Sequence, residues 1–346
     1  MQKLANCVNI LDSFRIPISF KERAVKQKIY PYYGAQGIID YVDDFIFDGE
    51  YILVAEDGEN LRSLNQNIAT FVTGKFWVNN HAHILGENGK ANLKYIYYLL
   101  NSMDLRKYVT GSAQPKFNQA NLANIEIKLP SIETQNKIST VLSTLDEKIA
   151  VNKKINATLE AMAKTLYLHL FFRRPANGKI GDLIIENPKS TISVGVAKNS
   201  GGNFPFFTSG ENILRWNENL VDGRNIFMND GGNVGINFYV GKAAYSTHTY
   251  CITAEKGMAD YLFLFLESIQ TEIEKRFFTG TGLKNLRKDL LRKHEIYIPT
   301  QTEIDAFNKK VQPCFDMISK NQRENYLLEN LREFLLPLLM NGQVGF

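Results

Sequence analysis

Two stretches of the chain repeat apolar residues at alternating spacings of three and four. Each predicts a helix of about 40 residues, or about 60 Å. Both begin after a hydroxyl residue, Ser131 or Thr300, with a glutamate in the first turn, which is the pattern of a helix N-cap. An asparagine pair interrupts the apolar positions in the middle of each helix, as in a coiled-coil seam. The predicted seam residues are Leu142, Leu145, Ile149, Asn152, Asn156, Leu159, Ile318, Asn321, Asn325 and Leu328.

The residues before each long helix predict short strands, because aromatic and β-branched residues alternate with polar ones between Asp-Gly and Gly-Gly turns. One shorter helix is expected in each of these regions, at about 93–108 and about 259–278. A glycine-bearing loop follows each shorter helix. A last strand then ends at Pro130 in the first region and at Pro299 in the second.

These two regions are copies of each other. The segment 30–33 (YPYY) returns as 204–207 (FPFF), 95–102 (YIYYLLNS) returns as 261–268 (YLFLFLES), and 125–130 (IEIKLP) returns as 294–299 (HEIYIP). Further matches keep the same order at an offset of about 170 residues, which predicts a tandem duplication. The long helices share this offset, so they belong to the duplicated unit.

Because the two long helices leave equivalent ends of equivalent domains, we expect them to pack antiparallel. Asn152 would then face Asn325, and Asn156 would face Asn321, with hydrogen bonds that set the register. The alternative is that these asparagines are solvated where the helices bow apart. Arg332 interrupts the apolar stripe, and we expect its stem to lie along the edge with its charge in water. The sequence therefore predicts an α+β fold, with two duplicated globular domains separated by two long antiparallel helices that form a coiled coil with pseudo-two-fold symmetry.

Composition narrows the classes of protein. A net charge of +4 and a pI of about 8.7 permit a nucleic-acid partner without requiring one. Basic residues concentrate in 275–293, whereas 40–59 holds only acidic charges and cannot lie against phosphates. Three isolated cysteines argue against disulfides and against a thiolate zinc site, so we expect a cytoplasmic protein. No apolar stretch approaches the roughly 20 residues of a membrane span, so no membrane partner is expected.

The order of these segments resembles the specificity subunits of type I restriction–modification systems. The stretch 110–118 (TGSAQPKFN), the strand 125–130 and Glu133-Thr134-Gln135 resemble the junction between domain and helix in that family. The second copy, from 279–284 (TGTGLK) through Pro299, is similar but lacks a glutamine at the place of Gln114. The motifs are short, so the resemblance draws its specificity from their order and duplication over essentially the full chain. The chain is somewhat short for the family, which suggests trimmed recognition domains.

The resemblance implies two target recognition domains, 1–130 and 173–299, that alternate with conserved spacer helices at 131–172 and 300–346. It implies that each domain reads one half of a bipartite site on double-stranded DNA. Because the two copies differ in sequence, that site should be asymmetric. It also implies that the helices dock methyltransferase subunits, expected as two, through which restriction subunits join the complex. The chemistry of S-adenosylmethionine and ATP would belong to those partners, so no cofactor and no catalytic residue is expected here.

Candidate DNA contacts lie in the loop after each shorter helix, where backbone N–H, hydroxyl, amide and basic groups can bind phosphate or base edges. They are Gly111, Ser112, Gln114, Lys116 and Asn118 in the first copy, and Gly280, Thr281, Lys284, Asn285 and Arg287 in the second. A second polar cluster comprises Asn79, Asn80 and His81, with Thr247 and His248 as its equivalents, and Arg215 is a further candidate. The alternative for the loops is a helix-capping turn with solvated charges. His81 and His83 have no third metal ligand within sequence reach, so no metal site is expected.

Two segments imitate enzyme motifs. The segment 278–282 (FTGTG) matches a glycine motif of methyltransferases but follows a predicted helix, where a cofactor loop needs a strand. The segment 126–128 (EIK) imitates a nuclease motif whose lysine is absent from its copy, 295–297 (EIY). The alternative to a DNA reader is therefore a duplicated protein-binding scaffold that does not read DNA sequence.

Overall fold

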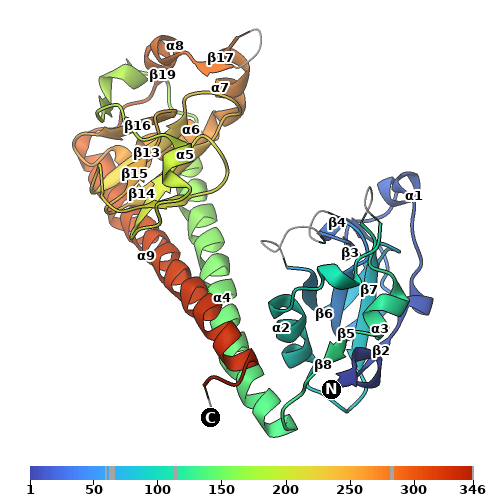
Figure 1. The fold of residues 1–346 in the computed structure, drawn as a ribbon. Coiled ribbons are helices and arrows are strands. Elements are labelled where there is room, and N and C mark those ends of the chain that lie inside the picture. The colour runs from blue at the N-terminus through green and yellow to red at the C-terminus, as the bar shows by residue number, and fades with distance from the viewer. Residues whose placement is uncertain (59–60, 62–66, 112–114, 281–283, 345–346) are drawn as a thin grey trace. The chain divides into compact units, whose positions relative to one another are not determined.

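The structure is a computed structural model, and it describes residues 1–58, 61, 67–111, 115–280 and 284–344. The chain divides into two compact units. The first comprises Met1–Lys148 with Leu327–Phe346, and the second comprises Ile149–Tyr326. Each unit contains one repeat and part of both long helices, α4 (Ile132–Leu170) and α9 (Gln301–Met340) (Figure 1). Within the described part of the chain, none of the helices has both the length and the hydropathy that a membrane span requires.

The first repeat is built on a sheet of six strands. Their spatial order is β2 (Val8–Ile10), β7 (Ala82–Glu87), β5 (Phe47–Ala55), β6 (Ala69–Val78), β3 (Tyr30–Gly34) and β4 (Gly37–Val42). Neighbouring strands are antiparallel except β3 and β6, which pair in parallel at Tyr32 and Trp77. This parallel pair joins the central antiparallel strands to the aromatic YPYY segment.

Side chains of β5 alternate between two apolar cores, because successive residues of a strand point to opposite faces. Ile52 packs in the core that also contains Ile96 of α2 (Leu93–Ser102). Leu53 packs in the core on the opposite face, with Phe76 and Ile84. The sheet is therefore buried on both faces, and α2 lies beside β6 in Figure 1.

The second repeat has the same strand order in two sheets. One sheet contains β10 (Ile184–Glu186), β16 (Thr249–Ala254), β13 (Arg224–Asn229) and β14 (Ile236–Val240), and the other contains β12 (Leu214–Trp216), β11 (Phe204–Phe207) and β15 (Ala244–Tyr245). The strand equivalent to β6 is interrupted at Gly241, whose φ of 123° lies in the region that favours glycine. The parallel pair Phe206 and Ala244 corresponds to Tyr32 and Trp77. This shared order confirms the predicted duplication.

Short elements complete both repeats. Among the described residues, the remaining α-helices are α1 (Phe20–Ala24), α3 (Gln119–Ala123), α5 (Val194–Ala197), α6 (Ala259–Ser268), α7 (Gln270–Arg276) and α8 (Lys288–Lys293). The remaining strands form the antiparallel pairs β1 (Gln2–Lys3) with β8 (Glu126–Ile127), β9 (Gly178–Lys179) with β19 (Glu295–Ile296), and β17 (Phe278–Thr279) with β18 (Asn285–Leu286).

The two shorter helices are shorter than the sequence predicts. The first ends at Ser102, and the second breaks into α6 and α7 after Ser268. In both repeats this serine donates its hydroxyl to the carbonyl three residues back, at 2.8 Å from Ser102 and 2.6 Å from Ser268. Such a side-chain bond competes with continuation of the helix. Apolar periodicity alone did not reveal this end.

Both long helices begin where their caps predict. The hydroxyl of Ser131 accepts the amide of Thr134 at 3.2 Å. The hydroxyl of Thr300 accepts the amide of Glu303 at 3.3 Å, and the Glu303 carboxylate accepts the amide of Thr300 at 2.9 Å. The second helix therefore starts with a complete capping box.

The ends of the long helices complete the cores of the repeats. In the first unit, Leu142 of α4 and Leu339 of α9 are buried in one core. In the second unit, Tyr167 of α4 and Phe307 of α9 are buried together. Each core thus takes the beginning of one helix and the end of the other, so the helices are antiparallel within each unit. Each compact unit therefore combines one repeat with the ends of both long helices.

In the second unit the structure brings the asparagines together in the predicted pairs. Asn152 is 1% exposed and donates its amide to Asn325 at 2.9 Å and to Glu324 at 2.8 Å. Asn321 donates to Asn156 at 2.8 Å. Of the two arrangements that the sequence allowed, the structure therefore has the hydrogen-bonded one and not the solvated one. Among the other seam residues, Leu142, Ile149 and Ile318 are buried, and Leu145, Leu159 and Leu328 are half-buried.

Arg332 differs from the expectation of a side chain whose charge lies in water. Its guanidinium lies 2.6 Å from the carboxylate of Asp146, and the hydroxyl of Tyr98 donates to the same carboxylate at 2.6 Å. The arginine is therefore part of a half-buried ion pair within the first unit, which neutralises its charge at the edge of the apolar stripe.

Candidate nucleic-acid interface

In the first repeat, the end of β5 joins the two polar clusters that are separate in the sequence. The amide of Glu56 donates to the carbonyl of His81 at 2.9 Å, and the carbonyl of Glu56 accepts the amide of Phe117 at 2.8 Å. The next residue, Asp57, forms a β-bridge with Lys116, and its carboxylate lies 2.6 Å from Nδ1 of His81. The predicted cluster at 79–81 and the described end of the predicted loop, residues 115–118, therefore lie side by side on one surface.

The second repeat makes the same backbone bonds. The amide of Asp230 donates to the carbonyl of His248 at 2.9 Å, and its carbonyl accepts the amide of Leu286 at 3.0 Å. Gly231 forms a β-bridge with Asn285, as Asp57 does with Lys116. The residues after β13 thus join the segments 247–248 and 284–287 by backbone bonds, as the residues after β5 join the two polar clusters of the first repeat.

The candidates of the first loop differ in what their side chains do. Lys116 is exposed, with its ammonium 3.3 Å from the carboxylate of Glu56. The side chain of Asn118 accepts the amide of Asn121 at 2.8 Å and so caps α3. This is the helix-capping role that the sequence analysis gave as the alternative to DNA contact. Gly111 is exposed with a φ of 87°, and Ser112 and Gln114 lie outside the described residues.

The cluster beside the first loop offers two exposed side chains, Asn80 and His81. Asn79 is buried, and its side chain accepts the amide of His81 at 2.8 Å. Asn79 therefore shapes the turn between β6 and β7, whereas the side chains of Asn80 and His81 reach the surface.

In the second repeat Lys284, Asn285 and Arg287 are exposed, and Arg287 donates two hydrogen bonds to Asp289 at 3.1 and 3.0 Å. Gly280 is exposed, and Thr281 lies outside the described residues. Thr247 is half-buried. His248 is exposed and lines a hollow of about 430 Å³ together with residues of the segment 208–212, which the sequence analysis did not single out.

Arg215 does not join the other candidates. Its guanidinium lies 3.3 Å above the ring of Tyr326 on α9 and donates to the carbonyl of Asn203 at 3.3 Å. The positive charge of Arg215 therefore interacts with the face of the Tyr326 ring, within the second unit.

Sequence reasoning missed a buried charged group under the first loop. Nδ1 of His83 lies 2.6 Å from the carboxylate of Asp12, and Nε2 lies 2.6 Å from the carbonyl of Phe117. Burial raises the pKa of Asp12, but its hydrogen bond to His83, the charge of His83, the Ile84 amide and Arg15 together lower that pKa below its usual value. The available signal was a histidine inside the apolar run of β7. The described residues contain no cluster of potential metal ligands.

Under the second loop the equivalent group is a tyrosine. Tyr250 donates its hydroxyl to Glu186 at 2.7 Å, and Arg292 lies 2.7 Å from the same carboxylate. Lys288 lies 4.3 Å above the Tyr250 ring and 3.4 Å from Asp230. The two loops therefore have the same backbone support and different side chains beneath them.

Comparison with known proteins identifies the class. The family model described as the type I restriction modification DNA specificity domain matches residues 7–161 and again 176–326. The chain belongs to this family, and the resemblance found in the sequence is confirmed.

Individual relatives agree with this assignment. A putative type I restriction enzyme specificity subunit of Haemophilus influenzae is 35% identical over 41% of this chain, and the match covers only 36% of that relative's length. The type I restriction enzyme MjaIX specificity subunit of Methanocaldococcus jannaschii is 26% identical over 72% of this chain and 69% of its own length. The crystal structure of the S subunit of a type I restriction-modification system from M. genitalium has a TM-score of 0.70 at 15% identity, covering 98% of this chain and 95% of that one. At that identity the likeness is one of fold.

Proposed function

We propose that this chain is a DNA sequence-specificity subunit that reads a bipartite, asymmetric site on double-stranded DNA, one half with each repeat. The observation that supports it is the paired loop surface. Its backbone bonds are the same in both repeats, while its exposed side chains differ. Asn80, His81 and Lys116 in one repeat and His248, Lys284 and Asn285 in the other offer different donors and acceptors to base edges. A shared scaffold with different readers suits a split site with unlike halves.

The same proposal assigns catalysis to other subunits. The chain reads DNA and carries no catalytic site, and two methyltransferase subunits dock on α4 and α9, with restriction subunits joining through them. S-adenosylmethionine and ATP are then bound by those partners.

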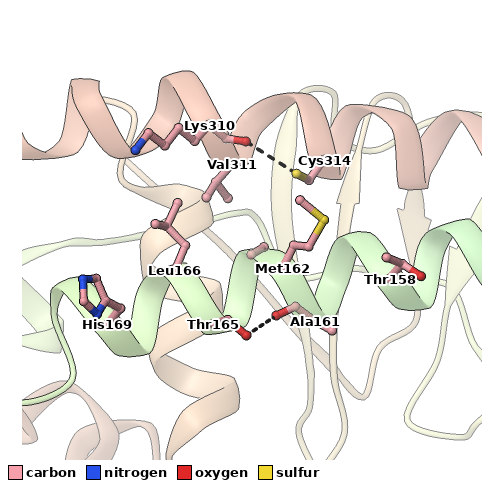
Figure 2. A pocket seen from close by; sticks show the side chains of 10 residues that line it. Thr158, Ala161, Met162, Thr165, Leu166, His169, Lys310, Val311 and Cys314 are labelled. Carbon is pink, nitrogen blue, oxygen red and sulfur yellow. Dashed lines mark hydrogen bonds between the residues drawn. The ribbon is translucent and has the colours of Figure 1, made fainter.

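Apolar surface on the long helices supports this docking. In the second unit a groove of about 870 Å³ lies between α4 and α9, lined by Met162, Leu166 and Val311 among others (Figure 2). In the first unit, Leu331 and Phe334 of α9 are 43% and 66% exposed. Leu331 occupies the position that corresponds to Met162 in the repeat, whereas Phe334 corresponds to the polar Thr165. Exposed apolar surface at equivalent positions is typical of a protein interaction site that is used twice.

Methylation mapping tests the proposal. The chain is co-expressed with a type I methyltransferase subunit, and methylated adenines are mapped across the genome. A split, asymmetric motif is expected. Random or absent methylation with an intact complex favours the alternative, a duplicated scaffold that does not read DNA.

The salt dependence of DNA binding tests the second loop. Lys284→Ala with Arg287→Ala should lower the slope of log affinity against log salt by up to about two, because each lost phosphate contact releases about one counterion fewer. Lys242→Ala is the control. Its neighbour Gly241 bonds to Gly223, at the end of β13 opposite Asp230, so the slope should not change. An equal effect of both changes contradicts phosphate binding by this loop.

A further inference from the structure

His83 lies on β7 under the first loop, and both of its ring nitrogens face oxygen atoms. The side chain is 1% exposed, with Asp12 at 2.6 Å on one side and the carbonyl of Phe117 at 2.6 Å on the other. A backbone carbonyl only accepts hydrogen bonds, so Nε2 carries a proton and donates it. The contact with Asp12 needs a second proton between the two groups. The His83–Asp12 pair therefore holds two protons.

Neighbouring groups hold the Asp12 carboxylate in place. Its other oxygen accepts the amide of Ile84 at 3.0 Å, and Arg15 lies 3.4 Å away. Arg15 also binds Glu56 at 2.9 Å, and Glu56 lies 4.0 Å from His83. The charged groups nearest to His83 are thus Asp12, Glu56 and Arg15, and Lys116 lies 3.3 Å from the Glu56 carboxylate.

The bond to Phe117 lies at the base of the loop. The amide of Phe117 is bonded to Glu56, and its carbonyl is bonded to His83. Lys116, the preceding residue, exchanges two backbone hydrogen bonds with Thr110, at 2.7 and 2.9 Å. The described flanks of the loop are therefore held together, and His83 adds a side-chain bond to the backbone bond between Phe117 and Glu56 that joins them to the sheet.

The second repeat uses no histidine at this position. Tyr250 stands at the place of His83 in β16 and donates to Glu186. At this position a side chain that bonds to the loop backbone is thus found in the first repeat, whereas the tyrosine of the second repeat bonds to a carboxylate.

We propose that His83 is a positioning residue for DNA reading by the first repeat, which holds the described part of the loop, residues 110–111 and 115–118, through the Phe117 carbonyl and so sets the fidelity of one half-site. This inference rests on the proposed function. It adds that the loops of the two repeats are supported by different side chains, His83 in the first repeat and Tyr250 at the equivalent position of the second.

Two substitutions distinguish the hydrogen bond of His83 to Asp12 from its hydrogen bond to the Phe117 carbonyl. In His83→Gln the side-chain amide reaches toward the place of Nε2 and keeps a donor for Phe117. In His83→Asn the amide lies near the place of Nδ1 and loses the bond to the loop. Tyr250→Phe is the matched control in the second repeat, because it removes a hydrogen bond at the equivalent position without touching the loop backbone.

Each variant is co-expressed with the methyltransferase, and both the methylated motif and amide hydrogen exchange of the assembled complex are measured. His83→Asn should raise methylation of sites with one mismatch in one half about tenfold and leave the other half unchanged. The Phe117 amide should exchange about tenfold faster in this variant. His83→Gln and Tyr250→Phe should stay within about twofold of the unaltered chain in both measurements.

Equal loss of fidelity in both halves, no loss in either, or the same loss in His83→Gln as in His83→Asn overturns the inference. If His83→Asn does not assemble, Asp12→Asn with His83→Leu replaces it, because this pair removes the loop donor without leaving an unpaired buried charge. The double variant must then relax the same single half-site. Absence of any split motif in the unaltered complex refutes the proposed function instead, while amide exchange still tests whether His83 holds the loop.

Discussion

The two repeats support their loops with matching backbone bonds. Glu56 bonds to His81 and Phe117 in the first repeat, and Asp230 bonds to His248 and Leu286 in the second. Beneath these bonds the side chains differ. The first repeat buries a charged pair, His83 with Asp12, and the second places Tyr250 beside a carboxylate that an arginine also binds near the surface.

This difference shows which part of the molecule duplication constrains. Strand pairing and the bonds at the ends of β5 and β13 involve backbone atoms, so they persist when side chains change. The groups that lie under the loops and on their surface are side chains, so substitutions can change them in one repeat without changing the other. One architecture can therefore hold two unlike readers.

The largest expected effect comes from removing one partner of the buried pair. Asp12→Ala leaves the His83 ring without its counter-charge and should lower the free energy of unfolding of the first unit by about 3–5 kcal/mol. Glu186→Ala is the matched change in the second repeat. Its side chain is 45% exposed, so the loss should be about 1 kcal/mol or less. Urea denaturation of both variants measures this, and equal losses would contradict the contrast between a buried and a surface support.

A smaller difference should appear in the response to pH. Burial raises the pKa of the Asp260 carboxyl in α6 to about 6, although Arg224, 2.6 Å away, acts in the opposite direction. Between its ordinary value and about 6, the folded state binds more protons than the unfolded state, so stability falls as the pH rises through this window. The loss should be about 2–3 kcal/mol and complete by about pH 7. The corresponding residue of the first repeat is Lys94, which pairs with Glu147 at the surface.

Urea denaturation at pH 5 and pH 7.5 should show about 1.4 kcal/mol of this loss, because the pKa of about 6 lies about one pH unit above the lower measurement. Asp260→Asn should lack most of the decrease that the unaltered chain shows, since the amide does not titrate. The same decrease in both proteins would assign it to other groups.

The smallest effect concerns the helix seam of the second unit. Asn152→Ala removes the donor to Asn325 and Glu324 at a buried position, and it should cost about 1–2 kcal/mol. Asn156→Ala removes a half-buried acceptor and should cost less than about 1 kcal/mol. Thermal unfolding of the two variants measures which substitution costs more stability. A larger loss from Asn156→Ala would contradict the conclusion that the Asn152 pair is the more important of the two.

The sequence determined the features that depend on local periodicity and order. The three-and-four spacing and the caps at Ser131 and Thr300 predicted the long helices, because each residue of a helix is positioned by its near neighbours. The duplication was visible because the matched segments keep one order along the chain. The pairing of Asn152 with Asn325 followed from the antiparallel arrangement that the duplication implies.

Only the tertiary structure decided how the loop surfaces are assembled. The bond between Glu56 and Phe117 joins residues far apart in the chain, and no local pattern records it. The capping role of Asn118, the buried turn at Asn79 and the engagement of Arg215 with Tyr326 likewise depend on where a side chain ends after folding. His83 is the sharpest case, because its chemistry comes from Asp12 and Phe117, which the fold brings to opposite sides of one ring.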